Sequence, residues 1–186
     1  MARSGMYDLI ARLRDMVDDA DAATWTSDQL QDVLDRHQYR VLREPLEREK
    51  TNLSATSYEY RIYHSRWRDF EAGGTTFFNI EASNGEQRGT ATYTADYARG
   101  VVTMATDQMG TALYLTGRTY DLNGAAAALW KQRAGKVASY YDAKTDGHSL
   151  SRSQWFAHCK EMADMYASEA RAHTVRMWRN DLVDDL

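Results

Sequence analysis

The spacing of the apolar residues changes twice along this chain, and this change constrains the fold more than any other feature. Apolar side chains recur three or four positions apart in four segments, which predicts amphipathic helices at roughly 4–19, 26–37, 119–141 and 152–178. Between about 39 and 118 that spacing fades, and β-branched and aromatic residues cluster. We therefore expect an α+β fold that is mainly α. It is an antiparallel bundle of about four helices (4–38 and 119–178) with a central antiparallel β-hairpin or β-arm inserted at about 56–117.

Two segments carry the residues that typically begin a helix. In residues 25–30 (WTSDQL), Thr26 can cap the first turn and Gln29 can reach back to it. Trp25 and Leu30 flank this pair at the spacing of a hydrophobic staple. Residues 150–155 (LSRSQW) repeat the same order, so the second and the last helix should begin in the same way.

The middle of the chain should form short antiparallel strands. Tyr58, Tyr60 and Ile62 alternate with the residues between them, which is the period of a strand with two different faces. Further strands are expected at about 75–80, 90–95, 101–105 and 112–116. The segment between the second and third of these, 96–100 (DYARG), predicts a hairpin turn in which Gly100 adopts a positive φ.

Charge and composition disfavour several classes of protein. The chain has 23 Lys and Arg against 27 Asp and Glu, whereas a dedicated nucleic-acid-binding domain shows a basic excess. Its single cysteine, Cys159, cannot form an intramolecular disulfide, which is typical of a reducing cytoplasm. Neither a signal segment nor an apolar run of membrane-spanning length is visible. With 186 residues and one proline, Pro45, we expect one soluble domain (1–186) that ends in an acidic tail at 179–186.

No group of residues has the spacing of a catalytic or metal site. The histidines include no HxxxH or HExxH pair. His158 and Cys159 are adjacent, but neighbouring helix positions point about 100° apart, so the two do not ligate one metal. Cys159 also lies on the apolar stripe of the last predicted helix, where a thiol is inert. Asp146, His148 and Ser149 lack the nucleophile elbow of a serine hydrolase, and the glycine pairs lack a P-loop lysine. We expect no enzymatic activity, no cofactor and no metal.

A run of arginine and aromatic residues in the β insertion leaves two interpretations open. The run contains Tyr60, Arg61, Tyr63, Arg66, Trp67 and Arg68. Such a run can stack nucleic-acid bases. Glu59, Asp69 and Glu71 neutralise the same stretch, so an arm that contacts a neighbouring subunit is the favoured interpretation.

Several motifs that occur in a fixed order carry a resemblance to a known family. They are residues 9–14 (LIARLR), 25–30 (WTSDQL), 114–122 (YLTGRTYDL), 125–130 (AAAALW) and 145–154 (TDGHSLSRSQ). Taken together, they resemble the head–tail connector (adaptor, or head completion) family of tailed bacteriophages. The resemblance lies at both ends of the chain, and the β insertion matches it less clearly.

The resemblance implies a structural virion protein, made in the host cytoplasm, that forms a ring, usually a dodecamer, in the neck below the portal. The implied partners are further copies of the chain, the portal protein, and stopper, terminator or tail proteins on the tail side. Genomic DNA would pass through the lumen without sequence-specific binding, and no membrane is involved. The alternative is a small helical DNA-binding or DNA-packaging accessory protein, which would need a basic face.

A closed ring needs a head-to-tail contact between two unlike surfaces. We expect this contact on the β-arm and on the small-residue face of the third helix, where another chain can approach closely. The candidate interface residues are Tyr58, Tyr60, Ile62, Trp67, Phe77, Phe78, Ala125 and Ala128. In such connectors the C-terminal helix often reaches the portal, which here implies contacts from Val175, Trp178, Arg179, Leu182 and Val183. A helix end that packs on its own bundle is an equally good interpretation of that segment.

Overall fold

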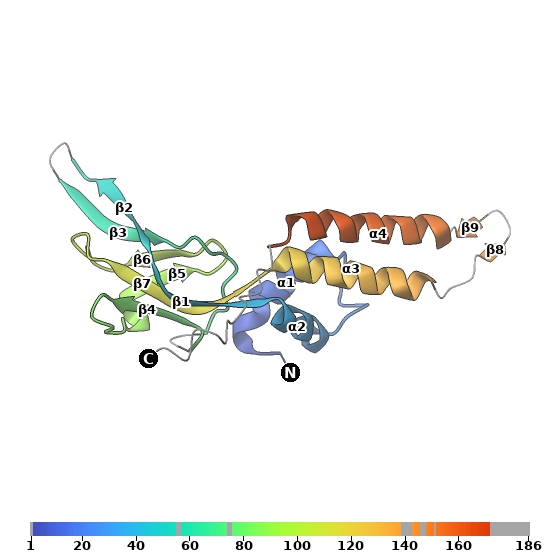
Figure 1. Ribbon diagram of the computed structural model, residues 1–186, viewed down its shortest axis with the longest axis horizontal. Helices are drawn as coiled ribbons and strands as arrows, with labels where there is room; N and C mark the ends of the chain where they lie inside the picture. Colours follow the sequence, from blue (N-terminus) through green and yellow to red (C-terminus); the bar gives the residue numbers. More distant parts are fainter. Residues whose placement is uncertain are drawn as a thin grey trace, which may run out of the picture.

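The structure is a computed structural model that describes residues 2–54, 57–73, 76–138, 143–145, 148–150 and 152–171. It has two parts arranged end to end, a β-sheet part and a helical part (Figure 1). Each part has its own cluster of buried apolar side chains.

Helices α1 (Tyr7–Met16), α2 (Ser27–Arg36), α3 (Leu122–Ala138) and α4 (Arg152–Glu169) form the helical part, with a 3-10 turn η1 (Ser4–Met6) before α1. Leu13, Leu30 and Leu129 are fully buried among them. α3 and α4 lie side by side and project from the other helices (Figure 1). Between these two helices, β8 (Ala143–Thr145) pairs with β9 (His148–Leu150).

The start of α2 confirms the predicted capping box. The backbone amide of Gln29 donates to Thr26 Oγ1 (3.2 Å), and the amide of Thr26 donates to Gln29 Oε1 (2.9 Å). Trp25 and Leu30 are both buried in the helical core, as the staple requires. The similar segment before α4 includes residue 151, which lies outside the described residues, so its capping stays a prediction.

Two antiparallel sheets pack face to face in the β part. The first has the strand order β1 (Gln38–Pro45), β7 (Leu113–Tyr120), β4 (Phe78–Ala82). The second has the order β2 (Glu47–Asn52), β3 (Tyr58–His64), β6 (Val101–Met104), β5 (Tyr93–Asp96), and a 3-10 turn η3 (Thr90–Thr92) leads into β5. Both sheets contribute side chains to one apolar core, which contains Tyr63, Phe70, Phe78, Ile80, Val102, Met104, Leu113 and Leu115.

Paired strands join the two parts. β1 follows α2 directly and β7 leads into α3, and the register of these strands pairs Gln38 with Tyr120. Tyr120 is the last residue of a strand, yet its side chain belongs to the helical core. Asp121 then caps the start of α3, because its Oδ1 accepts a hydrogen bond from the amide of Gly124 (3.1 Å). The connection is therefore a hydrogen-bonded ribbon and not a single linker.

The expected mainly helical bundle is wrong. Within the described residues, seven strands form two antiparallel sheets beside four helices, and about 40% of these residues are helical and 29% lie in strands. The β part begins at Gln38 and not near residue 56, because β1 and β2 belong to it. These two strands expose most of their side chains, and β2 (EREKTN) is almost entirely polar, so neither shows the apolar alternation on which strand prediction depends.

The predicted hairpin between β5 and β6 is confirmed. Asp96 pairs with Val101 across the turn, and Gly100 has a φ of 69°. A Cβ at Gly100 would also collide with the carbonyl oxygen of Trp67, so both conformation and space require glycine here. The strand predicted to end at 116 continues to Tyr120. The helix predicted to begin at 119 correspondingly begins at Leu122.

Candidate functional site

The β2–β3 hairpin and the loop beside it expose large apolar side chains. Leu53 is 61% exposed, Tyr58 52% and Met109 88%. Tyr58 and Met109 line a shared pocket of about 360 Å³. The Nζ atom of Lys50 lies 4.0 Å from the centre of the Tyr58 ring, a cation–π contact that favours this position of the ring. We call Leu53, Tyr58 and Met109 the arm tip.

Charged residues protect the free edge of the sheet that carries the arm tip. β2 is an edge strand, and it presents Glu47, Arg48, Glu49 and Lys50 in succession. Glu49 also pairs with His64 of the neighbouring strand at 2.7 Å. Charges on an edge strand oppose the addition of another strand. Contacts made by this hairpin should therefore come from the side chains of the arm tip.

The predicted interface residues fall into three groups by exposure. Tyr58 is exposed, Tyr60, Ile62, Trp67, Phe77 and Ala128 are partly buried, and Phe78 and Ala125 are buried. Phe78 is 1% exposed and packs edge-to-face on Phe70, with 5.2 Å between the ring centres. Ala125 is fully buried in the helical core, to which α1 and α2 also contribute. In this fold, neither Phe78 nor Ala125 is available to a neighbouring subunit.

α4 exposes most of its surface. Trp155 is 42% exposed and stacks on His158, with 5.4 Å between the ring centres. His158 in turn meets the ring of Trp130 edge-on at 5.8 Å, so this histidine packs between two indoles. The predicted portal contacts Val175, Trp178, Arg179, Leu182 and Val183 lie outside the described residues.

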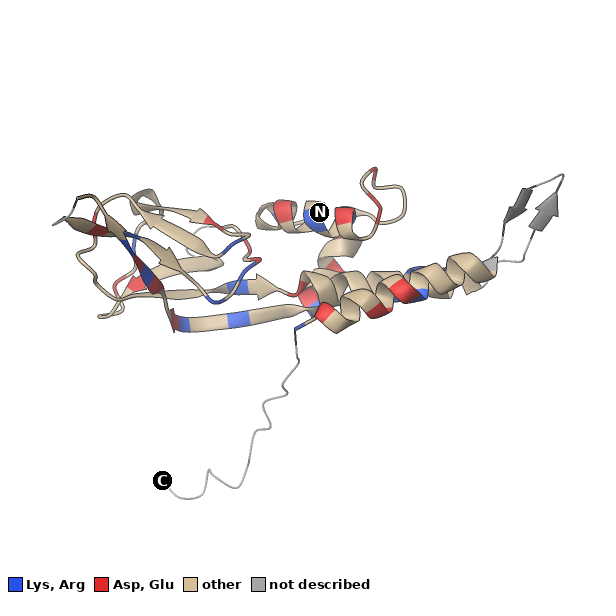
Figure 2. Cartoon of the chain, turned by 90° about the horizontal axis from the view of Figure 1, so that it is seen from above, with Lys and Arg blue, Asp and Glu red and all other residues tan. Residues whose placement is uncertain are grey.

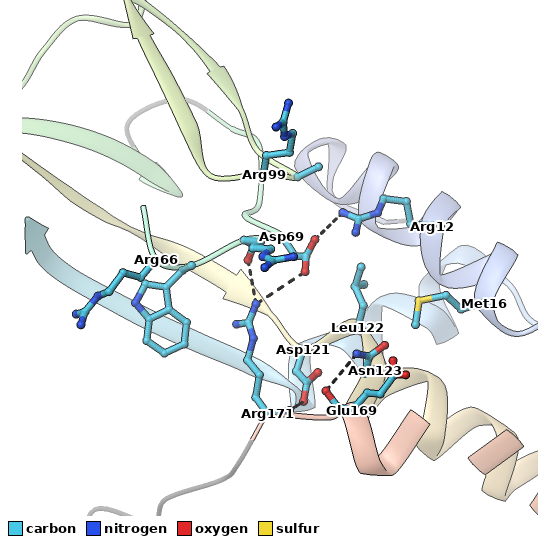
Figure 3. A pocket seen from close by; sticks show the side chains of 13 residues that line it. Arg12, Met16, Arg66, Asp69, Arg99, Asp121, Leu122, Asn123, Glu169 and Arg171 are labelled. Carbon is cyan, nitrogen blue, oxygen red and sulfur yellow. Dashed lines mark hydrogen bonds and ion pairs between the residues drawn. The ribbon is translucent and has the colours of Figure 1, made fainter. Parts of the chain in front are cut away.

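A cleft that the sequence did not predict opens where the two parts meet (Figure 3). It has a volume of about 860 Å³ and is lined by residues of α1, the β3–β4 connection, the β5–β6 turn, the start of α3 and the end of α4. Five arginines line it: Arg12, Arg66, Arg68, Arg99 and Arg171. We call it the arginine cleft.

Asp69 is the central carboxylate of the arginine cleft. Its Oδ1 accepts a hydrogen bond from Arg12 Nη1 at 2.6 Å, and its Oδ2 lies 3.8 Å from Arg171 Nη2 (Figure 3). Arg171 Nη1 also donates to Thr119 Oγ1 (3.0 Å), and its backbone amide donates to Asp121 Oδ2 (2.9 Å). These bonds tie α1, β7 and the end of α4 to the loop that carries Asp69.

The arginine cleft has a surplus of positive charge in an acidic chain. Its five arginines face three carboxylates in the lining, those of Asp69, Asp121 and Glu169. The whole chain has a formal net charge of −4. Arg68 and Arg99 are exposed and form no ion pair with any residue that the structure describes. The cleft is therefore a site that can receive carboxylate or phosphate groups.

Glu71 lies beside the cleft but is fully buried. It accepts hydrogen bonds from Arg3 Nε (2.8 Å) and from the hydroxyl of Tyr120 (2.6 Å). Burial raises the pKa of Tyr120 above its ordinary value, and the hydrogen bond to Glu71 raises it further. Arg3 also pairs with Asp35 at 2.6 Å, and this hydrogen bond raises the pKa of Arg3. We assign this network a structural role, because it joins the segment before η1, α2 and β7 through the buried side chains of Glu71 and Tyr120.

The single cysteine packs inside the helical core. Cys159 is fully buried, and burial raises the pKa of its thiol. In the part of the chain that the structure describes, no three His, Cys, Asp or Glu side chains are placed to hold a metal ion. None of the described helices has the length and apolar character needed to span a membrane.

The run of Arg66, Trp67 and Arg68 was visible in the sequence, but the remaining members of the cleft were not. Arg12 and Arg171 stand near opposite ends of the chain, and Arg99 occupies a turn. Only the packing of α1 and α4 against the β part brings them together.

Comparisons with models of protein families, with curated proteins and with solved structures find no match to this chain.

Proposed function

We propose that this chain is a non-enzymatic structural subunit of a tailed-phage head–tail connector, which forms a homo-oligomeric ring at the neck between portal and tail. The observation that carries the proposal is the arm tip, where Leu53, Tyr58 and Met109 are exposed on a hairpin whose edge is charged. Exposed clusters of large apolar and aromatic side chains mark surfaces that bind other proteins.

The ordered motifs at both ends of the chain supply the family in this proposal. Their resemblance to connectors favours further copies of the chain as the first partner, with the portal protein above and stopper, terminator or tail proteins below. The ring, usually a dodecamer, would belong to the virion after synthesis in the host cytoplasm. Genomic DNA would pass through its lumen without sequence-specific binding.

Measurement of mass in solution tests the proposal. Light scattering and negative-stain imaging of the full chain, alone and with a portal protein, should show a ring whose mass is a multiple of 21.3 kDa. The double variant Leu53→Ser, Tyr58→Ser should lose this mass while its far-UV circular dichroism is unchanged. The matched control is Leu42→Ser, since Leu42 is 66% exposed but lies outside the arm tip. A wild-type chain that stays monomeric at every concentration, with and without portal, contradicts the proposal.

The second candidate is a DNA-binding or DNA-packaging accessory protein, and the arginine cleft is the observation that favours it. Three carboxylates in the lining and the net charge of −4 weigh against it. A DNA-binding role requires affinity that falls steeply with salt and that is weakened in Arg68→Ala, Arg99→Ala. Absence of binding to duplex DNA at low salt removes this candidate.

A further inference from the structure

A second surface on the helical part is complementary in charge to the arginine cleft. A groove of about 570 Å³ lies between α1 and the start of α2, and its lining includes Tyr7 and Asp15. Tyr7 is 78% exposed at this groove. The two arginines of the lining are already neutralised within the chain, because Arg14 pairs with Asp19 at 2.8 Å and Arg3 pairs with Glu71 at 2.8 Å.

The carboxylates along this groove have no ion-pair partner of this kind among the described residues. Asp15 lies in the groove, Asp21 directly follows Ala20, which also lines it, and Asp18 stands two residues before Ala20. All three aspartates are exposed, and none forms an ion pair with a residue in the described ranges. Figure 2 shows several acidic residues on the N-terminal helices and on the loop between them. We call Tyr7, Asp15, Asp18 and Asp21 the acidic groove.

An exposed ring beside unpaired carboxylates matches the binding preferences of a guanidinium group. The face of Tyr7 can stack on the planar cation, and a carboxylate such as Asp15 can accept two parallel hydrogen bonds from it. Lysine would use only part of this arrangement, because its ammonium group is a point charge. The acidic groove is therefore suited to arginine side chains.

The acidic groove and the arginine cleft lie on different sides of α1. Arg12 and Met16 line the cleft, whereas Tyr7, Ala11 and Asp15 line the groove. One chain cannot bring its own two surfaces together in this fold, but two copies can. A contact between two unlike surfaces of identical chains is head-to-tail, so it repeats from copy to copy and can close into a ring.

We infer that the acidic groove of one copy receives Arg68 and Arg99 from the rim of the next copy's arginine cleft. This inference rests on the proposed ring and names a second contact between its successive subunits, in addition to that of the arm tip. Arg68 and Arg99 are the donors because they are exposed and unpaired among the described residues. Arg12, Arg66 and Arg171 already have carboxylate partners in their own chain.

Charge reversal on each side tests the contact in the full chain. One variant carries Asp15→Arg and Asp21→Arg, and the other carries Arg68→Glu and Arg99→Glu. Each variant alone should self-associate at least about tenfold more weakly than wild type, because like charges then meet across the contact. An equimolar mixture should recover the wild-type mass, since every junction between unlike variants again joins opposite charges.

The control reverses two exposed charges outside both surfaces, Lys160→Glu with Asp164→Lys on α4, and should keep the wild-type mass. Retention of the ring by both groove and cleft variants overturns this inference but leaves the proposed function standing. Two monomeric variants that stay monomeric when mixed also overturn it, even if each is folded by circular dichroism. A wild-type chain that never oligomerises instead removes the proposed function itself.

Discussion

Removal of the Tyr120 hydroxyl tests whether the Glu71 network holds the two parts of the molecule together. In Tyr120→Phe the ring stays in the helical core, but the buried Glu71 loses a donor at 2.6 Å. A hydrogen bond to a charged group contributes about 1.5–3 kcal/mol to stability. Because each kcal/mol shifts the Tm of a chain of this size by roughly 2–4 °C, the Tm should fall by roughly 3–12 °C.

Urea unfolding followed by circular dichroism, together with calorimetry, measures this loss at neutral pH. The matched control is Tyr114→Phe, because Tyr114 is partly exposed and its hydroxyl has no hydrogen-bond partner among the described residues. The control should change the free energy of unfolding by less than about 0.5 kcal/mol. A change as small as this in Tyr120→Phe would refute the reasoning that the phenol satisfies a buried charge.

The pH dependence of stability gives an independent check on the same bond. The pKa of Tyr120 is raised in the folded state above its ordinary value of 10.0, so the folded state retains the phenol proton when the unfolded chain has lost it. This contribution is fully present below pH 10 and is lost as the pH rises further. Stability should therefore fall more steeply above that pH in wild type than in Tyr120→Phe. Burial also raises the pKa of Tyr63 and Tyr93, so the variant should keep part of the slope. Equal slopes in the two proteins would contradict the assignment.

Two further substitutions test local features of the fold. Thr26→Ala removes the acceptor that caps α2, and urea titration should show a loss of about 0.5–2 kcal/mol, whereas no loss would argue against the capping box. Gly100→Ala places a Cβ against the carbonyl of Trp67 at a φ of 69°, so calorimetry should show destabilisation of at least about 1 kcal/mol. An unchanged Tm would show that the β5–β6 turn can adopt another conformation.

The parts of the fold that could be predicted from the sequence are those whose signals are local. The start of α2 depends on Thr26 and Gln29, which are three positions apart, and the β5–β6 turn depends on Gly100. Strands β1 and β2 give no such signal. β2 is an edge strand that buries little, and β1 is held by its pairing with β7, which joins residues 69 to 82 positions apart in the sequence. A strand whose side chains mostly face solvent shows no apolar alternation. The sequence therefore predicted fewer strands than the structure contains.

The candidate surfaces divide in the same way. Tyr58 was predicted to lie on a strand, because alternation is a local pattern, and to contact a neighbouring subunit; the structure places it on β3 and exposes it. Phe78 was predicted to lie at the same interface, but its strand lies in a sheet whose face is covered by the second sheet, and this could not be seen before the packing was known. The arginine cleft depends on Asp69 meeting both Arg12 and Arg171, a contact between three distant segments.

The junction that Tyr120 stabilises also sets the angle between the two charged surfaces proposed to form the ring. Arg68 lies on the β part, whereas Asp15 lies on α1, and the connecting bonds run through Asp69 and Glu71. Closure of a ring requires the same rotation at every contact, so a loose junction would give rings of several sizes or open chains. Tyr120→Phe leaves both charged surfaces intact. It should therefore still self-associate, but with a broader distribution of masses by native mass spectrometry than wild type. A distribution as narrow as that of wild type would show that the angle is set by contacts other than this junction.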